Sequence, residues 1–246
     1  MPPPDYTALV FPTLPDRPYV IINMVSSVDG HVTTGRSEEG LGSPADQRLM
    51  RELRFHADVV LDGAETLRIS GASPRLGDPA LEQRRVASGR PLTPVIATLT
   101  SGGQVPLDRP FFTATDFQAV VYAGDDMPPH RRRALAATGR EVVDVPADNP
   151  VPAMLDHMRT RLECSLLLCE GGPSINRLMF DAGVVDELFL TLGPVVVGGR
   201  NRLGAVGGRE IFPREHMPRL RLLHAIPNDE TDEVYLRYRV EHQTRS

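Results

Sequence analysis

The segment Leu167-Leu168-Cys169-Glu170-Gly171-Gly172-Pro173-Ser174-Ile175-Asn176 is the most informative part of this 246-residue sequence. Its apolar start predicts a buried strand, which ends at an acidic residue and two glycines before proline and serine open a helix. A glycine turn allows close approach to the backbone, and a helix start offers unpaired N–H groups at the positive end of the helix dipole. The segment therefore suits a phosphate seat, although plain connections use the same pattern. The glycine pair also predicts an unusual peptide geometry.

Strand and helix signals alternate along the rest of the chain. Strands are predicted at residues 19–25, 58–61, 95–98, 119–123, 141–145, 165–169, 186–193, 220–227 and 233–241, with a short extended piece at 31–34. Helices are predicted after an N-cap at Ser43 and at 63–69, 129–138, 151–162 and 174–182, whereas 71–91 is predicted to be irregular. This alternation predicts an α/β fold with a mainly parallel sheet, helices on both faces and an antiparallel C-terminal edge. We expect a proline-rich arm at residues 1–18 and one domain at 19–246.

The composition limits the possible classes of function. A formal net charge of −5 and the lack of a basic run argue against nucleic-acid binding, and the absence of lysine excludes Schiff-base and Walker-type lysine chemistry. Potential metal ligands do not cluster in the sequence, so no metal site is expected. No apolar stretch approaches the ~20 residues that span a membrane, and residues 1–18 carry no targeting pattern. We expect a cytoplasmic protein that does not bind membranes.

Three glycine-bearing turns follow predicted strands at one edge of this sheet. They are Asp62-Gly63-Ala64-Glu65-Thr66, residues 98–103, and Glu170-Gly171-Gly172-Pro173-Ser174. Ligands of open α/β sheets bind beyond the carboxyl ends of the strands. None of the turns matches G-x-G-x-x-G, the usual dinucleotide fingerprint. Three such turns still predict a site for an extended dinucleotide, with one turn contacting each part of it.

A series of short motifs in a fixed order resembles one known family. The motifs are Ser27-x-Asp29-Gly30, Leu53-Arg54, Ala57-Asp58-Val59-Val60-Leu61-x-Gly63-Ala64-x-Thr66, Pro74-Arg75-Leu76, Glu170-Gly171-Gly172-Pro173, Val185-Asp186-Glu187-Leu188, Gly193-Pro194 and Gly198-Gly199. Together they resemble the reductase domain of the bifunctional deaminase-reductase of riboflavin biosynthesis. That resemblance implies the three-layer fold of dihydrofolate reductase, a homodimer, and NADPH as cofactor. It also implies reduction of the ribosyl group of 5-amino-6-(5-phosphoribosylamino)uracil, by hydride from the nicotinamide.

The resemblance also implies roles for individual residues. Ser26 would lie beside the nicotinamide, Ser101 would meet the adenosine phosphate, and Glu170 would face the substrate. The implied cofactor-binding set is Ser26, Gly63, Thr66, Thr98, Ser101, Gly171, Gly172, Pro173, Ser174 and Ile175. The implied substrate-binding set is Ser27, Asp46, Arg54, Arg75, Leu76 and Glu170, with a substrate phosphate at Arg54.

Asp46 is the candidate catalytic residue. An acid near the start of the helix that lines the cleft would bind the N–H groups of an aminopyrimidine and relay a proton to the reduced centre. The alternative is that Asp46 only stabilises the first helical turn. Asp29, in contrast, is predicted to form a turn.

The sequence departs from the family pattern where that pattern holds substrate. Ala72-Ser73 stand in place of two aspartates before Pro-Arg-Leu, and Glu39-Gly40-Leu41 replace a segment that commonly contains tryptophan. Residues 98–103 lack an arginine for a 2′-phosphate. A pterin reductase related to dihydrofolate reductase, and an NADPH-binding protein without turnover, are therefore the alternatives. Deamination is excluded because the chain lacks H-x-E with P-C-x-x-C.

Overall fold

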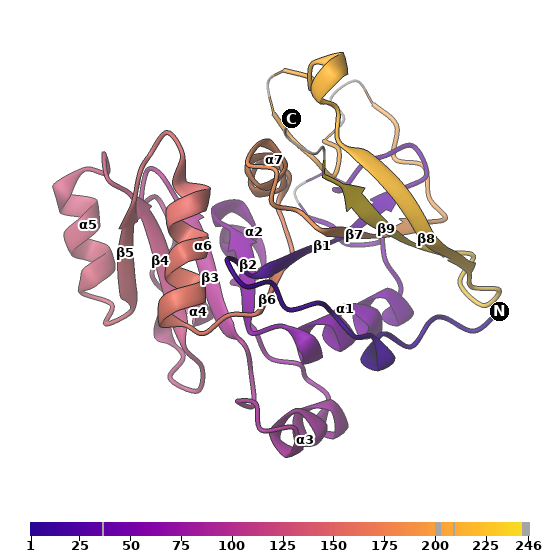
Figure 1. Ribbon diagram of the computed structural model, residues 1–246, viewed down its shortest axis with the longest axis horizontal. Coiled ribbons are helices and arrows are strands. Elements are labelled where there is room, and N and C mark those ends of the chain that lie inside the picture. Colours follow the sequence, from indigo (N-terminus) through magenta and orange to yellow (C-terminus); the bar gives the residue numbers. More distant parts are fainter. Residues whose placement is uncertain (36, 200–202, 209, 243–246) are drawn as a thin grey trace.

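Nine strands pair into one sheet in the part of the chain that the computed structural model describes, residues 1–35, 37–199, 203–208 and 210–242. Their bounds are β1 (Tyr19–Ser27), β2 (Val59–Gly63), β3 (Val95–Thr100), β4 (Ala119–Gly124), β5 (Glu141–Val145), β6 (Leu166–Cys169), β7 (Glu187–Gly193), β8 (Arg219–Pro227) and β9 (Val234–Glu241). The strand order is β5-β4-β3-β2-β6-β1-β7-β9-β8 (Figure 1). Every neighbouring pair from β5 to β7 is parallel, whereas β9 is antiparallel to both β7 and β8. The predicted mainly parallel sheet with an antiparallel C-terminal edge is therefore confirmed.

Proline opens almost every α-helix. The helices are η1 (Tyr6–Ala8), α1 (Pro44–His56), α2 (Ala64–Ser70), α3 (Pro79–Ala87), α4 (Pro110–Thr113), α5 (Pro129–Ala136), α6 (Pro150–Arg161), α7 (Pro173–Asp181) and η2 (Arg214–His216). A proline suits the first helical position, because its fixed φ is helical and its missing N–H would have no partner there. In α1 the Ser43 hydroxyl accepts the N–H groups of Ala45 and Asp46, which confirms the predicted N-cap. Among the described residues, no helix combines the length and apolar character needed to cross a membrane.

Helices cover both faces of the sheet and form the outer two of three layers (Figure 1). On one face α6 and α7 pack through Met154, Met158 and Met179 against alternate residues of the central strands. On the other face α1 packs through Leu49 and Leu53, and α2, α4 and α5 continue this layer over β3 and β4. The parallel strands are buried on both sides, as strands between two helical layers must be.

The proline-rich arm packs on the α1 side of the sheet. Tyr6 is buried, its ring meets Phe189 edge to face at 5.1 Å, and its N–H donates to Glu52 of α1 at 2.8 Å. Arg17 donates to both carboxylate oxygens of Asp186 at 2.7 Å. The segment predicted at 1–18 thus contributes to the core of the domain predicted at 19–246. Within that domain, residues 36, 200–202, 209 and 243–246 lie outside the described ranges.

Two local predictions are wrong. The sequence predicts an irregular segment at 71–91, yet α3 forms there after a cap from the side chain of Asp78. Its Arg85 is buried and donates to three backbone carbonyl oxygens, so a charged residue occupies a position where periodicity expects an apolar one. Residues 31–34 form no strand: the Val32 N–H donates to the Leu203 carbonyl oxygen, but the Thr34 N–H donates to the Ser37 carbonyl oxygen within its own loop.

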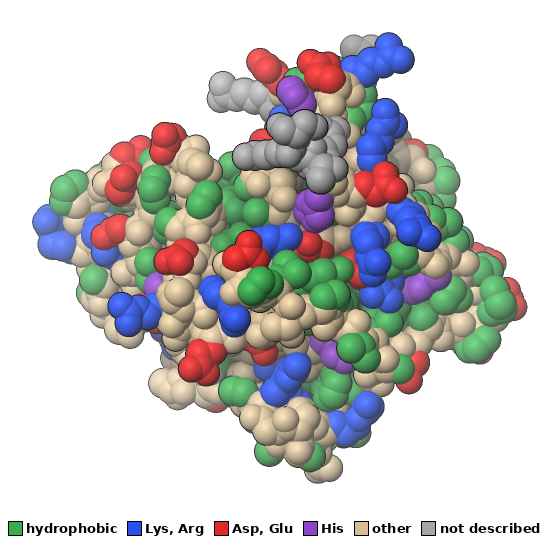
Figure 2. All heavy atoms as spheres, in the orientation of Figure 1, with side chains coloured by type: hydrophobic (Ala, Val, Ile, Leu, Met, Phe, Trp, Pro, Cys, Tyr) green, Lys and Arg blue, Asp and Glu red, His purple; other side chains and the backbone are tan. Residues whose placement is uncertain are grey.

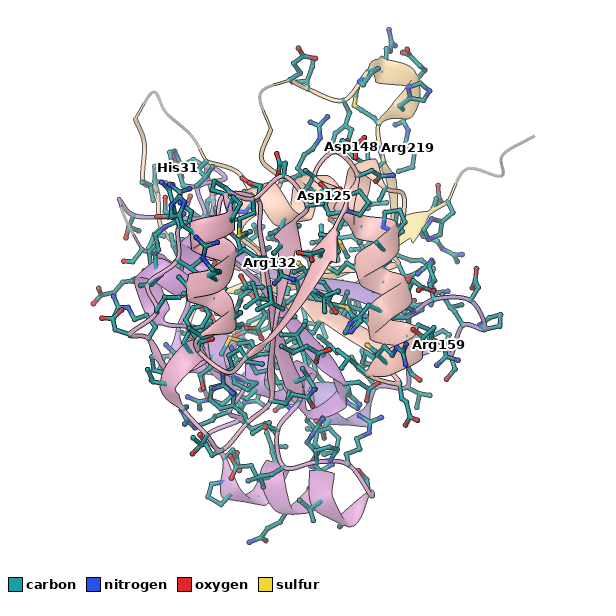
Figure 3. All side chains as sticks on the ribbon, turned by 90° about the vertical axis from the view of Figure 1, so that its left-hand side faces the viewer. His31, Asp125, Arg132, Asp148, Arg159 and Arg219 are labelled. Carbon is teal, nitrogen blue, oxygen red and sulfur yellow. The ribbon has the colours of Figure 1, made fainter. Side chains whose placement is uncertain are left out.

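The parallel strands end along one edge of the sheet. Figure 3 views the molecule from the side, with His31 after β1 and Asp125 after β4 towards the upper end, and Arg159 near the end of α6 lower down. The turns that follow β1, β2, β3 and β6 therefore meet at this edge, which is where open α/β sheets bind their ligands.

Candidate active site

Two glycine turns interlock at this edge. The Gly63 N–H donates to the Gly171 carbonyl oxygen at 2.6 Å, and a Cβ on Gly63 would lie 2.9 Å from the Gly172 nitrogen. Glycine at position 63 is what permits this approach between two backbones. Gly171 has φ +91°, and the peptide between Gly171 and Gly172 is cis, which confirms the unusual geometry predicted for this pair.

Helix α7 begins directly after the second turn. Pro173 is its first residue, and no side chain caps the N-terminus at Gly172. Ile175 packs into the core, and its Cγ1 lies 3.3 Å from the place of a Cβ on Gly63. Thr66 of α2 lies beside Gly172, with its hydroxyl oxygen 4.0 Å from the place of a Cβ on that glycine. The structure thus gathers Gly63, Thr66 and residues 171–174, whose role in binding the cofactor stays a prediction.

The other residues assigned to the cofactor are spread along the same edge. Ser26 is buried near the end of β1, Thr98 is fully buried in β3, and Ser101 is exposed directly after β3. Arg131 of α5 donates to the Gly102 carbonyl oxygen at 2.6 Å. Residues 98–103 contain no arginine of their own, but the Arg131 guanidinium reaches this loop from α5. Only the fold brings Arg131 there, because it lies 29 residues further along the chain.

Polar side chains form a row across the sheet on the face that α1 covers. Thr98 of β3 and Asp62 of β2 are register partners. Glu170 follows on the other side of Asp62, with its N–H bonded to the Leu61 carbonyl oxygen at 3.0 Å. Arg54 of α1 reaches the row and donates from Nε and Nη2 to the two carboxylate oxygens of Glu170 at 2.6 Å each.

The Arg54–Glu170 pair changes the roles expected for both residues. The two side chains are 12% and 9% exposed and satisfy one another with two parallel charge-assisted hydrogen bonds. A substrate phosphate at Arg54 would have to compete with a nearly buried carboxylate, so this geometry disfavours the predicted phosphate contact. The pair instead presents a neutral, polar wall in which Glu170 is held in one orientation.

Arg75 and Leu76 do not direct their side chains to this pair. The Arg75 guanidinium donates to both oxygens of Asp116, at 2.8 and 2.7 Å, and lies 5.1 Å from the centre of the Phe117 ring. Its backbone carbonyl oxygen accepts from Arg54 at 3.0 Å. Leu76 is fully buried. The Pro-Arg-Leu motif therefore supports Arg54 through its backbone.

Asp46 lies at the start of α1 with a perturbed carboxyl group. Burial raises its pKa to about 6, a hydrogen bond with Thr191 of β7 opposes that rise, and the charges of Glu233 and Glu38 add to it. Glu233 fixes this helix end, because its carboxylate accepts from both the N–H and the hydroxyl of Ser43 at 2.7 Å. An acid with such a pKa can exchange a proton near neutral pH, as the predicted catalytic role requires.

Ser27 is committed to the turn after β1. Its hydroxyl donates to Asp29 at 2.6 Å and accepts the His31 N–H at 2.9 Å, and the side chain is fully buried. Asp29 also accepts the N–H groups of Val197 and Gly198 at 3.1 and 2.7 Å. These bonds hold the pKa of Asp29 well below its usual range. The turn role predicted for Asp29 is confirmed, whereas a substrate contact by Ser27 would need the turn to open.

Sequence reasoning missed Asp62. This carboxyl is 2% exposed, and its Oδ1 has no hydrogen-bond partner among the described residues. Burial, followed by the charge of Glu170, raises the pKa of Asp62 well above its usual range, while Arg54 acts in the opposite direction. The signal in the sequence is an acidic residue directly after the apolar run Val59-Val60-Leu61, where the neighbouring glycine predicts a turn.

Metal-ligating side chains do not converge in the described part of the chain, where no group of three or more His, Cys, Asp or Glu is placed to hold an ion. Figure 2 shows acidic and basic side chains intermixed over one face of the molecule.

Comparison with known families gives this site a context. The model of the RibD C-terminal domain matches residues 18–230. The chain belongs to this family. Curated relatives of this chain include proteins named 2,5-diamino-6-ribosylamino-4(3H)-pyrimidinone 5′-phosphate reductase. The one from Aquifex aeolicus is 32% identical over 214 residues, which cover 84% of this chain and 90% of that protein. The one from Methanothermobacter thermautotrophicus is 28% identical over 208 residues, covering 84% and 91% respectively.

A solved structure supports the fold. A pyrimidine reductase-like protein from Corynebacterium diphtheriae superposes with a TM-score of 0.80 at 23% identity, covering 93% of this chain and 94% of that one. The expected family and architecture are therefore confirmed. The similarity spans nearly the whole length of these relatives, so the interlocked turns and the Arg54–Glu170 pair lie inside the shared domain.

Proposed function

We propose that this protein reduces the ribosyl group of a ribosylaminopyrimidine 5′-phosphate in riboflavin biosynthesis, with NADPH as the hydride donor. The observation that carries the proposal is the contact between the Gly63 and Gly171–Gly172 turns below the uncapped start of α7, next to the Arg54–Glu170 pair. A phosphate-binding backbone thus adjoins a polar wall suited to a sugar. The names of the two full-length relatives support the same reaction.

The residues present fit a nicotinamide dinucleotide. Among the described residues, a Cβ on Gly172 would meet no atom closer than 4.0 Å, so the backbone is open to a ligand there. The Thr98 hydroxyl is buried without a partner among the described residues. The bound cofactor would supply the hydride. The backbone of the Gly171–Gly172 turn and the Ser174 N–H at the start of α7 would hold its pyrophosphate, while Ser101 and the Arg131 guanidinium would serve the adenosine end.

The reaction also consumes a proton, for which Asp46 is our candidate. Hydride addition to the C1′ of the ring-opened sugar leaves a centre that must be protonated. Asp46 holds a proton below about pH 6 and hydrogen-bonds to Thr191. Its position at the first turn of α1 also suits binding of the N–H groups of a pyrimidine. Glu170, oriented by Arg54, would face the sugar hydroxyls.

The proposal has two versions, which differ in the pyrimidine ring of the substrate. The resemblance in sequence implies the uracil form, whereas the stand-alone relatives are named for the 2,5-diamino form. The test supplies purified protein with NADPH or NADH and each pyrimidine in turn, and follows the loss of nicotinamide absorbance and the gain of two hydrogens by mass spectrometry. We expect turnover with NADPH and at least one pyrimidine. Lack of oxidation with both pyrimidines overturns the proposal.

Two further arms of the assay address the alternatives. Oxidation of NADPH by dihydrofolate alone would favour the pterin reductase that Asp46 also suits. Tight NADPH binding without turnover of any substrate would favour a binding protein. We also propose a homodimer formed at the open edge of β8, where Leu220, Leu222 and Leu223 are exposed, and a cytoplasmic location.

A further inference from the structure

Asp62 occupies a position of β2 where a buried apolar residue would be expected. It lies in β2 after Val59, Val60 and Leu61, all of them fully buried. Val60 contacts the apolar cluster of α1, so alternation along the strand turns Asp62 to the same face. A carboxyl at such a place costs folding free energy unless it is paired. Its presence therefore calls for an explanation other than packing.

The surroundings of Asp62 do not anchor it. No hydrogen bond reaches its Oδ1 among the described residues, and the hydroxyl of its register partner Thr98 is also unpartnered and buried. Buried polar atoms in native proteins are almost always satisfied, and exceptions concentrate at functional positions. Two adjacent exceptions at the carboxyl ends of β2 and β3 mark the floor of the proposed site.

The charges that face Asp62 come from three elements. Arg54 of α1 is the cation, Glu170 after β6 and Glu38 from the loop after β1 are the acids, and the neighbouring Cys169 thiol stays neutral because burial raises its pKa to about 12. One guanidinium thus faces three carboxyl groups. An ionised Asp62 would compete with Glu170 for Arg54, since both lie within its field. An un-ionised Asp62 leaves Arg54 entirely to Glu170, which is the arrangement observed.

We propose that Asp62 is a positioning residue of the substrate site that works as a neutral acid and keeps Arg54 bound to Glu170. It acts through Glu170 and does not touch the substrate, because it is 2% exposed. This inference rests on the proposed function, in which Glu170 contacts the sugar. Loss of the Asp62 proton converts the site to a form that binds substrate poorly, and burial, which raises the pKa of Asp62, moves that change toward alkaline pH.

The test compares the wild-type protein with Asp62→Asn. Asparagine keeps the shape and hydrogen-bonding capacity of the neutral acid but cannot ionise. We expect KM for the pyrimidine substrate in the wild-type protein to rise at alkaline pH, approaching tenfold per pH unit, because only the protonated fraction binds. The kcat should change less. In Asp62→Asn, KM should stay flat from pH 7 to 9.5, with kcat at pH 7 within a few-fold of the wild type. Asp144→Asn, which removes an exposed carboxylate paired with Arg132, is the matched control and should follow the wild type.

Two results overturn the inference. One is an alkaline rise in KM that persists unchanged in Asp62→Asn, and the other is a folded Asp62→Asn protein without activity at pH 7. Chemical unfolding provides a readout without substrate. A neutral Asp62 makes wild-type stability fall as pH rises above about 4, relative to Asp62→Asn, because the unfolded chain releases the proton there while the folded protein keeps it. Equal pH slopes would also overturn the inference. Lack of turnover at every pH, with the unfolding difference intact, would count against the proposed function alone.

Discussion

The Arg54 guanidinium holds both carboxylate oxygens of Glu170, with Nε and Nη2 each 2.6 Å from an oxygen. This pair joins α1 to the end of β6 and lies beside the interlocked glycine turns. It therefore couples the helix that carries Asp46 to the turn proposed to bind the cofactor.

Removing one partner of this pair should destabilise the protein strongly. Arg54→Met or Glu170→Met leaves a nearly buried group without its partner, at a cost of about 3–5 kcal/mol. The double variant should lose less than the sum of the two, since it leaves no isolated charge. Urea unfolding of the four proteins measures the coupling. Simple additivity would show that the pair contributes nothing as a unit.

Two alanine substitutions in the glycine turns should behave differently. Gly63→Ala places a Cβ 2.9 Å from the Gly172 nitrogen and should lower both the melting temperature and NADPH affinity. Gly172→Ala meets no atom of the described residues closer than 4.0 Å and should leave the melting temperature nearly unchanged while weakening NADPH binding. Calorimetric titration with NADPH checks both. Unaltered affinity in Gly172→Ala would mean that the cofactor does not approach this backbone.

Asp46 should make both rate and stability depend on pH. If its proton serves the reduction, kcat falls as pH rises through about 6, and Asp46→Asn removes that limb while lowering kcat roughly 100-fold. The raised pKa also means that, between about pH 4 and 6, the folded state keeps a proton that the unfolded state has lost. Wild-type stability should therefore fall across that window relative to Asp46→Asn. If Asp46 only stabilises the helix, Asp46→Asn should leave the dependence of kcat on pH unchanged.

The start of α1 should depend on its two-part cap. Ser43→Ala removes a side-chain cap worth about 1 kcal/mol, together with one bond to Glu233. Glu233→Ala should cost more, because Glu233 is buried and also accepts the hydroxyl of Tyr235 at 2.6 Å. Thermal unfolding orders the two variants. A larger loss of stability in Ser43→Ala than in Glu233→Ala would mean that the cap within the helix, and not the contact with Glu233, is the main restraint.

The exposed leucines on β8 should hold the proposed dimer. Leu222 is 50% exposed on an edge strand, where an unpaired backbone is open to a second sheet. Leu222→Arg should halve the mass measured by light scattering. Val86→Arg, at a similarly exposed site on α3, is the control and should keep the wild-type mass. A monomeric wild-type protein would contradict the proposal.

Local sequence signals predicted the parts of this molecule that depend on neighbouring residues. The Glu170-Gly171-Gly172-Pro173 turn was visible because glycine and proline restrict the backbone within a few residues. The partnership of Arg54 with Glu170 was not, since 116 residues separate them and only the register of the sheet brings them together. Asp62 was missed for the same reason, because its burial depends on strands paired from elsewhere in the chain. Helix α3 was missed because Arg85 faces inward and finds carbonyl oxygens there.

The place of β1 in the sheet has a consequence for synthesis of the chain. β1 lies between β6 and β7, where Tyr19 pairs with Leu166 and Ser27 with Gly193. The first strand to leave the ribosome must therefore wait for partners made in the last third of the protein. Long-range pairing of this kind folds slowly and leaves apolar strands exposed in the meantime. A nascent chain that stalls before β7 should consequently be a substrate for chaperones, whatever its N-terminal half has already assembled.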